Sequence, residues 1–374
     1  MKSDGVRVVF RVDASTEIGG GHVFRCLTLA EELRGNGIVS AFVCREQPGD
    51  LIGIIAGLGH TVLRLTAPGG NEGRQSGTKA EDFRDTGAAL AAFPRFDWMV
   101  VDHYGIDASW EREARRFATN IMVIDDLANR RHDCDVLLDQ NYYLNAARRY
   151  EGRIPDSSVL LLGPGNALLR KEFHEARPRA TLRSSGIRRV LVSYGSSDPT
   201  NETEKALSAL ELADCGSMDT VVVIGSTNPR QHEIIRRCSE RPNIQLIIQT
   251  NRMAELCLDA DLSLGAGGST MWERCLLGLP TLVIITAENQ SEVVEAVTTT
   301  GAIVNCGRSA GVTANDLAFQ IRSLLRSPSR LEAMSAACFE LMKDANPVSS
   351  AARTICETAP DRQRVTPSPS GQAR

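Results

Sequence analysis

Short runs of Val, Ile and Leu recur along the whole sequence and alternate with stretches of helical pattern. Seven such runs lie in the first half, from VRVVFRVD to SVLLLGPG, and six lie in the second half, from RRVLVSYG to AIVNCG. Runs of this length that are apolar on both faces are typical of buried parallel strands, and parallel strands need crossover helices. The alternation therefore predicts an α/β fold built on two parallel sheets.

A polar, basic stretch without strand character, ALLRKEFHEARPRATLRSSG, separates the two series of runs. It predicts two Rossmann-like domains, over residues 1–165 and 186–358, joined by a linker over 166–185. Residues 67–77 are Gly-rich and residues 359–374 are rich in Pro and Ser, so we expect a surface insertion and a disordered tail there. Ligands of open parallel sheets bind beyond the carboxyl ends of the strands, so the two sheets are expected to face each other across a cleft.

Composition argues against several classes of protein. The 374 residues carry a net charge of -4, and this slightly acidic balance argues against general binding to nucleic acid or to anionic membranes. No apolar run approaches the roughly 20 residues that span a bilayer, and the first residues alternate charged and apolar side chains, unlike a signal peptide. None of the 10 cysteines is spaced as CxxC. We therefore expect a cytoplasmic enzyme with free thiols and without a metal or cofactor, whose oligomeric state the sequence leaves open.

The segment FRVDASTEIGGGHVFRC combines a strand that ends near Asp13, three consecutive glycines and a histidine. Gly20 and Gly21 let the backbone approach a ligand closely, and free amides at a helix N-terminus attract phosphate or carboxylate groups. His22 is expected where that helix begins. Because the helix dipole disfavours positive charge there, a neutral imidazole could act as a general base; the alternative is a tight turn with His22 exposed to water. The glycines do not follow the GxGxxG pattern, which argues against a nicotinamide-dependent oxidoreductase.

A second glycine-rich loop occurs in LSLGAGGSTMWERC. It leads into a helix that is predicted to begin at Ser269 or Thr270, an arrangement that can hold a diphosphate. Glu273 lies about one turn further along that helix. Its carboxylate could accept hydrogen bonds from two ribose hydroxyls, or it could complete a capping box with Thr270.

Two more strand-to-helix junctions of the second domain carry polar side chains. In VSYGSSDPTN a helix is predicted to start at the Asp-Pro pair, with Asn201 facing a ligand over its mouth. Plain N-capping by Ser197 or Asp198 is the alternative there. In TAENQSEVV, the side-chain amides of Asn289 and Gln290 can bind a phosphate or a sugar hydroxyl, again with capping as the alternative.

In the first domain, two strands end in acidic or aromatic residues. Asp102, His103 and Tyr104 follow one buried strand, and Asp125 and Asp126 follow another. Such carboxylates could hold a metal or sugar hydroxyls, although loops carry residues of this kind routinely.

The motifs IGGGHVFRC, VDHYGI, IDDLANRRHDCDVLLDQN, NALLRKEF, YGSSDPTN and GAGGSTMWERC occur in this order along one chain. This series resembles the UDP-2,4-diacetamido-2,4,6-trideoxy-β-L-altropyranose hydrolases of pseudaminic acid biosynthesis. It is similar, more distantly, to the N-acetylglucosaminyltransferases that make lipid II for peptidoglycan. The resemblance covers roughly Val8 to Ala345 and implies a GT-B fold and hydrolysis of a UDP-linked diacetamido sugar. The chain departs from the family in having Gly195-Ser196 where Gly-Gly is frequent, and in the insertion at 67–77.

The resemblance also implies roles for individual residues. It implies that His22 is the general base, that Tyr104 is the aromatic sugar contact, and that Asn201 and Glu273 bind uridine diphosphate. Further expected substrate contacts are Gly20, Gly21, Gly195, Ser196, Gly268, Thr270, Asn289 and Gln290. In the implied inverting reaction, His22 takes a proton from the water that attacks the anomeric carbon, and helix N-termini neutralise the leaving diphosphate in place of a metal.

Two alternatives would use the same cleft. A GT-B glycosyltransferase would replace the water by an alcohol acceptor, and a lipid acceptor would need an exposed apolar patch, of which the sequence of the first domain gives no convincing sign. A non-catalytic nucleotide-sugar binding module would need no base, so it predicts that His22 is exposed to water and points away from the cleft.

Overall fold

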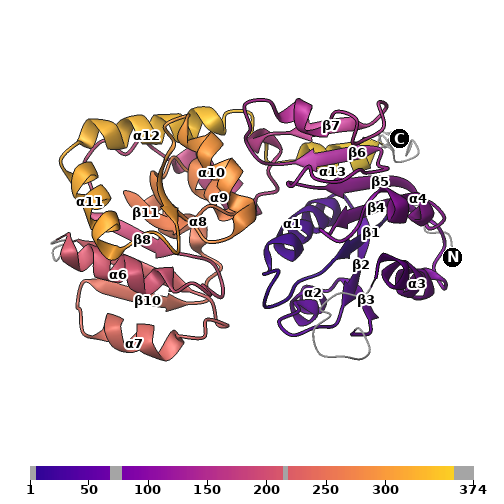
Figure 1. The fold of residues 1–374 in the computed structure, drawn as a ribbon, viewed down its shortest axis with the longest axis horizontal. Coiled ribbons are helices and arrows are strands. Elements are labelled where there is room, and N and C mark those ends of the chain that lie inside the picture. The colour runs from indigo at the N-terminus through magenta and orange to yellow at the C-terminus, as the bar shows by residue number, and fades with distance from the viewer. Residues whose placement is uncertain (1–5, 68–77, 214–217, 358–374) are drawn as a thin grey trace, which may run out of the picture.

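The computed structural model describes residues 6–67, 78–213 and 218–357 (Figure 1). Within these ranges the chain forms one sheet of seven parallel strands, in the order β3-β2-β1-β4-β5-β6-β7, and one of six, in the order β10-β9-β8-β11-β12-β13. All of the predicted runs form strands, so the predicted α/β fold is confirmed. Apart from Ala67, the predicted insertion at 67–77 and the predicted tail at 359–374 lie outside the described residues.

The first sheet forms the N-terminal domain together with short helices. Its strands are β1 (Arg7–Val12), β2 (Val39–Arg45), β3 (Thr61–Leu65), β4 (Phe96–Asp102), β5 (Ala118–Ile124), β6 (Val136–Asp139) and β7 (Val159–Leu162). Its helices and 3-10 turns are α1 (Gly21–Gly35), α2 (Ile52–Gly57), α3 (Lys79–Leu90), α4 (Ala108–Ala114), η1 (Ala146–Tyr150) and η2 (Pro164–Asn166).

The second sheet has the same construction. Its strands are β8 (Arg189–Ser193), β9 (Asp219–Ile224), β10 (Ile244–Ile248), β11 (Leu262–Ala266), β12 (Thr281–Ile285) and β13 (Ile303–Arg308). The helical elements after β7 are α5 (Lys171–Ala176), η3 (Arg177–Arg179), α6 (Glu202–Leu212), α7 (Gln231–Ser239), α8 (Met253–Asp259), α9 (Thr270–Leu276), η4 (Glu288–Gln290), α10 (Ser291–Thr298), α11 (Ala314–Leu325), α12 (Pro328–Leu341) and α13 (Ser350–Glu357). None of the helices within the described ranges is long and apolar enough to cross a membrane.

Apolar side chains cover both faces of each sheet, which is why the strands are continuous apolar runs and do not alternate with polar residues. In β1, Val8 and Phe10 pack into one core with residues of α1, and Val9 packs into the core on the opposite face. Phe10 stacks on Phe42 of β2, with ring centroids 4.7 Å apart. The second sheet likewise has a core on each face.

The chain crosses between the domains twice. After β7 it passes into α5, where Phe173 packs into a core of the second domain. After α12 it returns, and Ile355 of α13 packs into the core of the first domain against α1, where Ser349 Oγ also donates a hydrogen bond to Glu32 Oε2 at 2.6 Å. Figure 1 shows α13, in yellow, beside β5 and β6. The predicted domain 186–358 is therefore wrong at its end, because α13 completes the other domain.

Asp139, at the end of β6, is a buried carboxyl group whose protonation should control stability. Burial raises its pKa to about 7, although Asn141 N–H and Tyr150 Oη donate hydrogen bonds to it at 3.0 Å and 2.9 Å. An unfolded Asp titrates near 4. Between these values the folded state binds more protons than the unfolded state, so its stability should rise as the pH falls through 7.

Replacing Asp139 by Asn should remove this contribution. We expect the melting temperature of the wild type to fall more between pH 5.5 and pH 8.5 than that of Asp139→Asn, because the wild type alone acquires a buried charge. Thermal unfolding at a series of pH values measures the difference. The exposed Asp156→Asn is the matched control and should follow the wild type. Identical pH profiles for Asp139→Asn and the wild type would contradict the expectation.

Candidate active site

The first glycine-rich loop brings His22 to the end of the neighbouring strand. Strands β1 and β4 are adjacent in the sheet, so the β1–α1 connection lies over the last residue of β4, Asp102. His22 Nδ1 lies 2.5 Å from Asp102 Oδ1, and both side chains are buried. A carboxylate can only accept at this distance, so Nδ1 carries a hydrogen, and the neutral form of this imidazole has its lone pair on Nε2. His22 is therefore oriented and inside the structure, and the alternative of a water-exposed imidazole is wrong.

Arg25, one turn after His22 on α1, fixes the charge of Asp102. Its Nε and Nη2 each donate a hydrogen bond to Asp102, at 2.6 Å. Burial by itself would raise the pKa of Asp102, but the Arg25 guanidinium outweighs it and, with His22, holds the pKa well below its usual range. Asp102 is thus a permanent carboxylate behind the imidazole, and Arg25 is a member of this cluster that the sequence reasoning missed.

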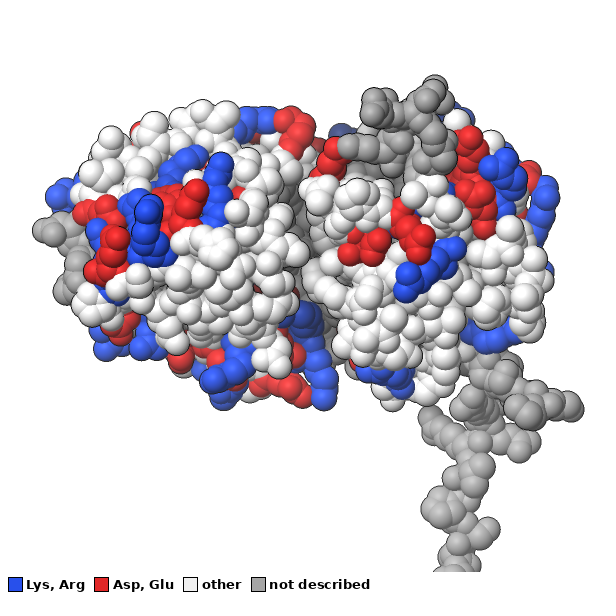
Figure 2. Space-filling view, turned by 90° about the horizontal axis from the view of Figure 1, so that it is seen from below, with Lys and Arg blue, Asp and Glu red and all other residues white. Residues whose placement is uncertain are grey.

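Tyr104 connects this group to the second domain. Its ring packs edge-on against the His22 imidazole, with centroids 4.5 Å apart. Its hydroxyl donates to Asp126 Oδ1 at 2.8 Å and accepts from Asn289 Nδ2 at 3.0 Å. Asn289 belongs to η4 of the second domain, so the structure places two of the predicted substrate contacts in direct contact between the domains. Figure 2 shows the furrow that separates the two domains on one face of the molecule.

The other acidic residues at strand ends do not form a shared ligand site. Asp125 is fully buried, accepts from Ala128 N at 2.8 Å and pairs with Arg130, whereas Asp126 faces Tyr104. His103 donates from Nε2 to Asp13 at 3.1 Å, because its Nδ1 accepts from a backbone amide. Among the described residues, no group of three His, Cys, Asp or Glu side chains has a metal-binding arrangement.

Glu273 is held by an arginine from the linker and not by its own helix. Arg170 donates from Nε and Nη2 to the two carboxylate oxygens, at 2.8 Å and 3.0 Å. The N-cap of α9 is Ser269, and no side chain caps it, so the capping box with Thr270 does not form. Arg170 lies in the motif NALLRKEF, to which the sequence analysis assigns no role. That motif is the sequence signal from which Arg170 could have been singled out.

The helix after β8 starts later than predicted. Helix α6 begins at Glu202 and not at the Asp-Pro pair. The Asp198 carboxylate caps the helix by accepting hydrogen bonds from Glu202 N and Thr203 N, at 2.9 Å each. The capping alternative is thus confirmed for Asp198. Asn201 is the N-cap residue in a left-handed conformation, φ +60°, and its side chain takes no part in capping.

The predicted loops of the second domain lie next to one another. Because β8 and β11 are neighbours, the Gly195-Ser196 turn and the loop after β11 meet at the same sheet edge. A Cβ atom at Gly267 would lie 2.3 Å from Val294 Cγ2, so this loop packs directly on α10. Gln290 Oε1 accepts from Thr286 N at 3.0 Å, and its amide nitrogen faces Gly268.

Of the two predicted glycine contacts before His22, Gly20 packs closely against neighbouring side chains and Gly21 does not. A Cβ atom at Gly20 would lie 2.9 Å from Leu51 Cδ1 and 3.0 Å from Phe24 Cε2, so a side chain there would displace one of these two side chains. A Cβ atom at Gly21 would meet nothing within 4 Å.

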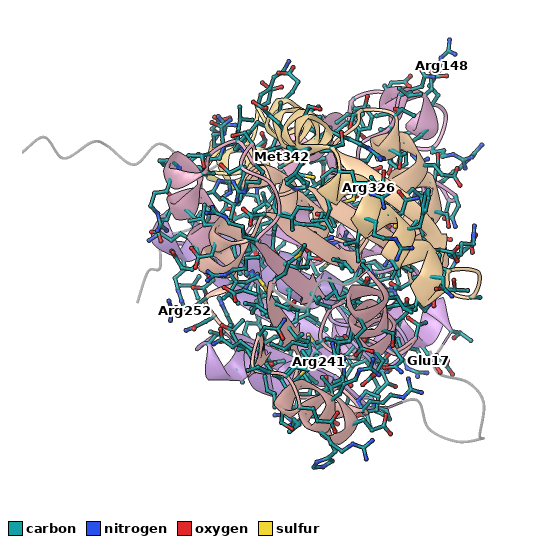
Figure 3. All side chains as sticks on the ribbon, turned by 90° about the vertical axis from the view of Figure 1, so that its left-hand side faces the viewer. Glu17, Arg148, Arg241, Arg252, Arg326 and Met342 are labelled. Atoms are coloured by element: carbon teal, nitrogen blue, oxygen red, sulfur yellow. The ribbon has the colours of Figure 1, made fainter. Side chains whose placement is uncertain are left out.

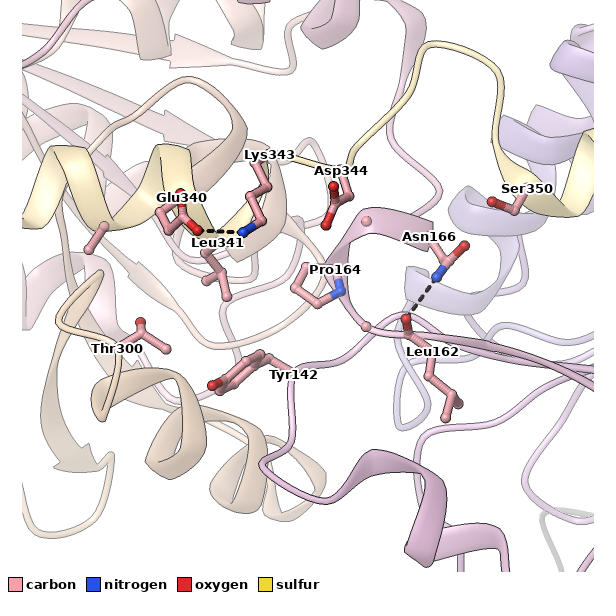
Figure 4. A pocket seen from close by; sticks show the side chains of 13 residues that line it. Tyr142, Leu162, Pro164, Asn166, Thr300, Glu340, Leu341, Lys343, Asp344 and Ser350 are labelled. Carbon is pink, nitrogen blue, oxygen red and sulfur yellow. Dashed lines mark hydrogen bonds and ion pairs between the residues drawn. The ribbon is translucent and has the colours of Figure 1, made fainter.

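A separate hollow of about 570 Å³ lies where the chain crosses between the domains (Figure 4). It is lined by the segment 162–166, by Tyr142 and Thr300, and by the end of α12. Lys343 already pairs with Glu340 at 2.6 Å there, and none of the predicted site residues lines it. The hollow is therefore distinct from the His22 site.

Comparisons with solved structures identify the architecture. The chain superposes on MurG of Acinetobacter baumannii with a TM-score of 0.61 and 14% identity, over 94% of this chain and 99% of that one. It superposes on UGT71G1 of Medicago truncatula, solved as a complex with UDP-glucose, with a TM-score of 0.62 and 12% identity, over 95% and 99% of the two chains. The chain has the GT-B fold. Residues 189–354 of this GT-B protein match the glycosyltransferase family 28 C-terminal domain.

Three sequence relatives extend the comparison. SpsG, a spore coat polysaccharide biosynthesis protein of Bacillus subtilis, is 33% identical over 171 residues, which are 45% of this chain and 50% of SpsG. The uncharacterized protein MJ1062 of Methanocaldococcus jannaschii is 26% identical over 295 residues, 77% of this chain and 57% of that protein. The UDP-2,4-diacetamido-2,4,6-trideoxy-beta-L-altropyranose hydrolase of Campylobacter jejuni is 26% identical over 286 residues, 76% of this chain and 93% of the hydrolase. The GT-B protein thus spans about half the length of SpsG and MJ1062, and its predicted resemblance to the hydrolase is confirmed.

Proposed function

We propose that this GT-B protein hydrolyses a UDP-linked 2,4-diacetamido-2,4,6-trideoxy sugar at the anomeric carbon, with inversion, and releases UDP and the free sugar. The observation that carries the proposal is the buried chain of contacts from Arg25 through Asp102 to His22, beside Tyr104 at the boundary between the domains. A binding module would not need an oriented imidazole backed by a fixed carboxylate. Similarity to the Campylobacter jejuni hydrolase supports the choice of substrate.

In this mechanism His22 activates a water molecule. Asp102 accepts the Nδ1 hydrogen and stabilises the imidazolium that forms, as carboxylates behind catalytic histidines do. His22 Nε2 takes one proton from water while the water oxygen bonds to the anomeric carbon and the bond to the diphosphate oxygen breaks. The electron pair leaves with UDP, and the single displacement inverts the anomeric centre. The proton on His22 then passes to solvent.

The second domain would hold UDP. Glu273, oriented by Arg170, would accept hydrogen bonds from the ribose hydroxyls. The loops at Gly195-Ser196 and Gly268–Thr270, with Asn201, Asn289 and Gln290, would donate to the diphosphate. Such donors stabilise a leaving group by preorganised electrostatics, without a metal.

Replacing Glu273 by Ala should weaken UDP binding. Hydrogen bonds to a charged group are worth about 1.5–3 kcal/mol, so we expect the Kd to rise roughly tenfold to hundredfold. Calorimetric titration with UDP measures the change. Glu172→Ala is the matched control, since Glu172 also pairs with Arg170, at 2.8 Å, and should leave the Kd unchanged. An unchanged Kd in Glu273→Ala would exclude a role in UDP binding and leave Glu273 only its ion pair with Arg170.

Incubation with a panel of UDP-linked sugars, followed by NMR, tests the reaction itself. The proposal requires UDP to appear with water as the only acceptor, and requires the first-formed free sugar to have the inverted anomeric configuration. Retention of configuration, or no UDP release from any diacetamido sugar, would contradict it.

A glycosyltransferase is the second candidate, favoured by the match of 189–354 to a glycosyltransferase family and by two exposed apolar side chains close to His22 in the sequence. Ile18 is 45% and Phe24 is 42% exposed, and both flank the glycine-rich loop. They could receive an apolar acceptor. UDP release that depends on an added alcohol in the same panel would favour this candidate.

A further inference from the structure

Buried arginines in this protein normally have a carboxylate partner. Five arginines are buried within the described ranges, and Arg11, Arg25 and Arg45 form ion pairs with aspartates. Arg183 is satisfied instead by backbone carbonyls, including Ala260 O at 3.1 Å and Cys257 O at 3.0 Å. Exposed arginines such as Arg148 and Arg252 extend from the outline of the molecule, as Figure 3 shows. Arg274 fits none of these groups.

Arg274 lies directly beneath the glycine-rich loop that follows β11. Its Nη2 donates to Ala266 O at 2.6 Å and its Nη1 donates to Thr270 Oγ1 at 3.2 Å. A Cβ atom at Gly265 would lie 2.7 Å from Nη1, so the glycine makes room for the guanidinium. The Arg274 side chain is buried, with 3% of the residue exposed, whereas Gly268 is half-buried and Thr270 is exposed. The loop therefore lies between the Arg274 guanidinium and solvent.

Within the described part of the chain this cation forms no ion pair, and the Glu273 carboxylate acts on it only from beyond ion-pair distance. No carboxylate lies within 4.0 Å of it, because its neighbour Glu273 turns to Arg170, and Arg274 Nε has no hydrogen-bond partner. Burial lowers the pKa of Arg274, which is the expected effect of an uncompensated charge in a dry site. A charge of this kind is costly unless something balances it.

The contact to Ala266 also orients the loop backbone. In a trans peptide the carbonyl and the following N–H point in opposite directions, so turning Ala266 O toward Arg274 turns Gly267 N–H away from it. Arg274 therefore supplies a positive charge below the loop and also fixes the orientation of the Ala266–Gly267 peptide.

We propose that Arg274 is the buried positive charge that binds the diphosphate of a nucleotide-linked ligand through the Gly265–Thr270 loop. The ligand anion provides the nearby counter-charge that Arg274 lacks, and the loop backbone lies between Arg274 and the anion. The inference rests on the proposed function in taking a nucleoside diphosphate as the ligand. Arg274 is a positioning residue, since it touches the loop and not the reacting atoms.

Binding measurements with UDP and with uridine separate this role from a merely structural one. In Arg274→Gln the Kd for UDP should rise by about tenfold to hundredfold, the effect of one unit charge across several ångströms of protein. The Kd for uridine, which has no phosphate, should stay within a factor of two. Calorimetry suits UDP, and ligand-observed NMR competition suits the weaker uridine. Equal losses for UDP and uridine, or no loss for UDP, would overturn the inference.

Two further variants keep the test decisive. Arg183→Gln removes the other buried arginine without a carboxylate, and it should lower the melting temperature without changing the ratio of the two Kd values. If Arg274→Gln does not fold, Arg274→Lys, which keeps a charge but moves it, must weaken UDP binding selectively or the inference fails.

Inorganic pyrophosphate distinguishes failure of the inference from failure of the proposed function. If the wild type binds pyrophosphate but not UDP, the proposed function falls, and a loss of pyrophosphate binding in Arg274→Gln still supports the inference. If the wild type binds neither, both fall.

Discussion

Replacing His22 by Asn should lower the rate of UDP release by about 10²–10⁴-fold, the usual contribution of general-base catalysis. Asn keeps a polar group near Asp102 but has no lone pair basic enough to take a proton from water. Because the expected UDP contacts come from the second domain, the Kd for UDP should change little. Initial rates with a diacetamido UDP-sugar and calorimetry with UDP measure the two quantities on the same preparation.

The control for this experiment is another histidine. His232 lies exposed on α7, so His232→Asn should retain the wild-type rate. A His22→Asn protein that turns over at the wild-type rate would exclude His22 as the base. A protein that loses UDP affinity in parallel with its rate would show that His22 binds the nucleotide instead.

Replacing Asp102 by Asn should damage both folding and reaction. Arg25 is buried with Asp102 as its closest partner, so the substitution leaves a dry guanidinium beside a neutral amide, at a cost of about 3–5 kcal/mol of folding free energy. The same change removes the acceptor that fixes the His22 tautomer, so the rate should also fall strongly at temperatures where the protein is still folded. Denaturant unfolding and low-temperature initial rates measure the two effects.

Asp126→Asn is the matched comparison for stability. Asp126 accepts from Arg25 at a longer 3.2 Å and is only partly buried, so its loss should cost about 1 kcal/mol. Equal stability of Asp102→Asn and the wild type would mean that Arg25 finds another partner. That result would contradict the assignment of Asp102 as the fixed carboxylate behind His22.

The strands of this protein can be predicted from the sequence because burial on both faces of a sheet requires a continuous apolar run, which is a local sequence pattern. A strand buried on both faces is apolar at most positions, and the thirteen runs meet that condition without reference to distant residues, although β1 and β2 also contain the buried Arg11 and Arg45. The return of α13 to the first domain was not predictable in this way, since Ile355 would satisfy a core in either domain.

The residues of the candidate site also differ in whether a local sequence pattern identifies them. His22 could be found from a glycine-rich turn before a helix, which is a local signal. Arg25 and Arg170 lie in the motifs IGGGHVFRC and NALLRKEF, but these motifs do not show what the two arginines bind. Their partners are Asp102 and Glu273, which are 77 and 103 residues away in the sequence. Asn201 is predicted to face a ligand over a helix mouth, but the left-handed backbone at Asp198 and Asn201 delays the helix start. Asp and Asn adopt this conformation more readily than other non-glycine residues, but an Asp-Pro pair is also a frequent helix start, so the residue types alone do not decide between the two.

The return of α13 also bears on how the protein is made. A ribosome completes β1 to β7 long before it adds the segment that closes their core against α1. During that interval the nascent first domain carries an unfilled apolar groove, the kind of surface that chaperones recognise. Its final consolidation has to wait until translation is almost finished, even though that domain is synthesised first.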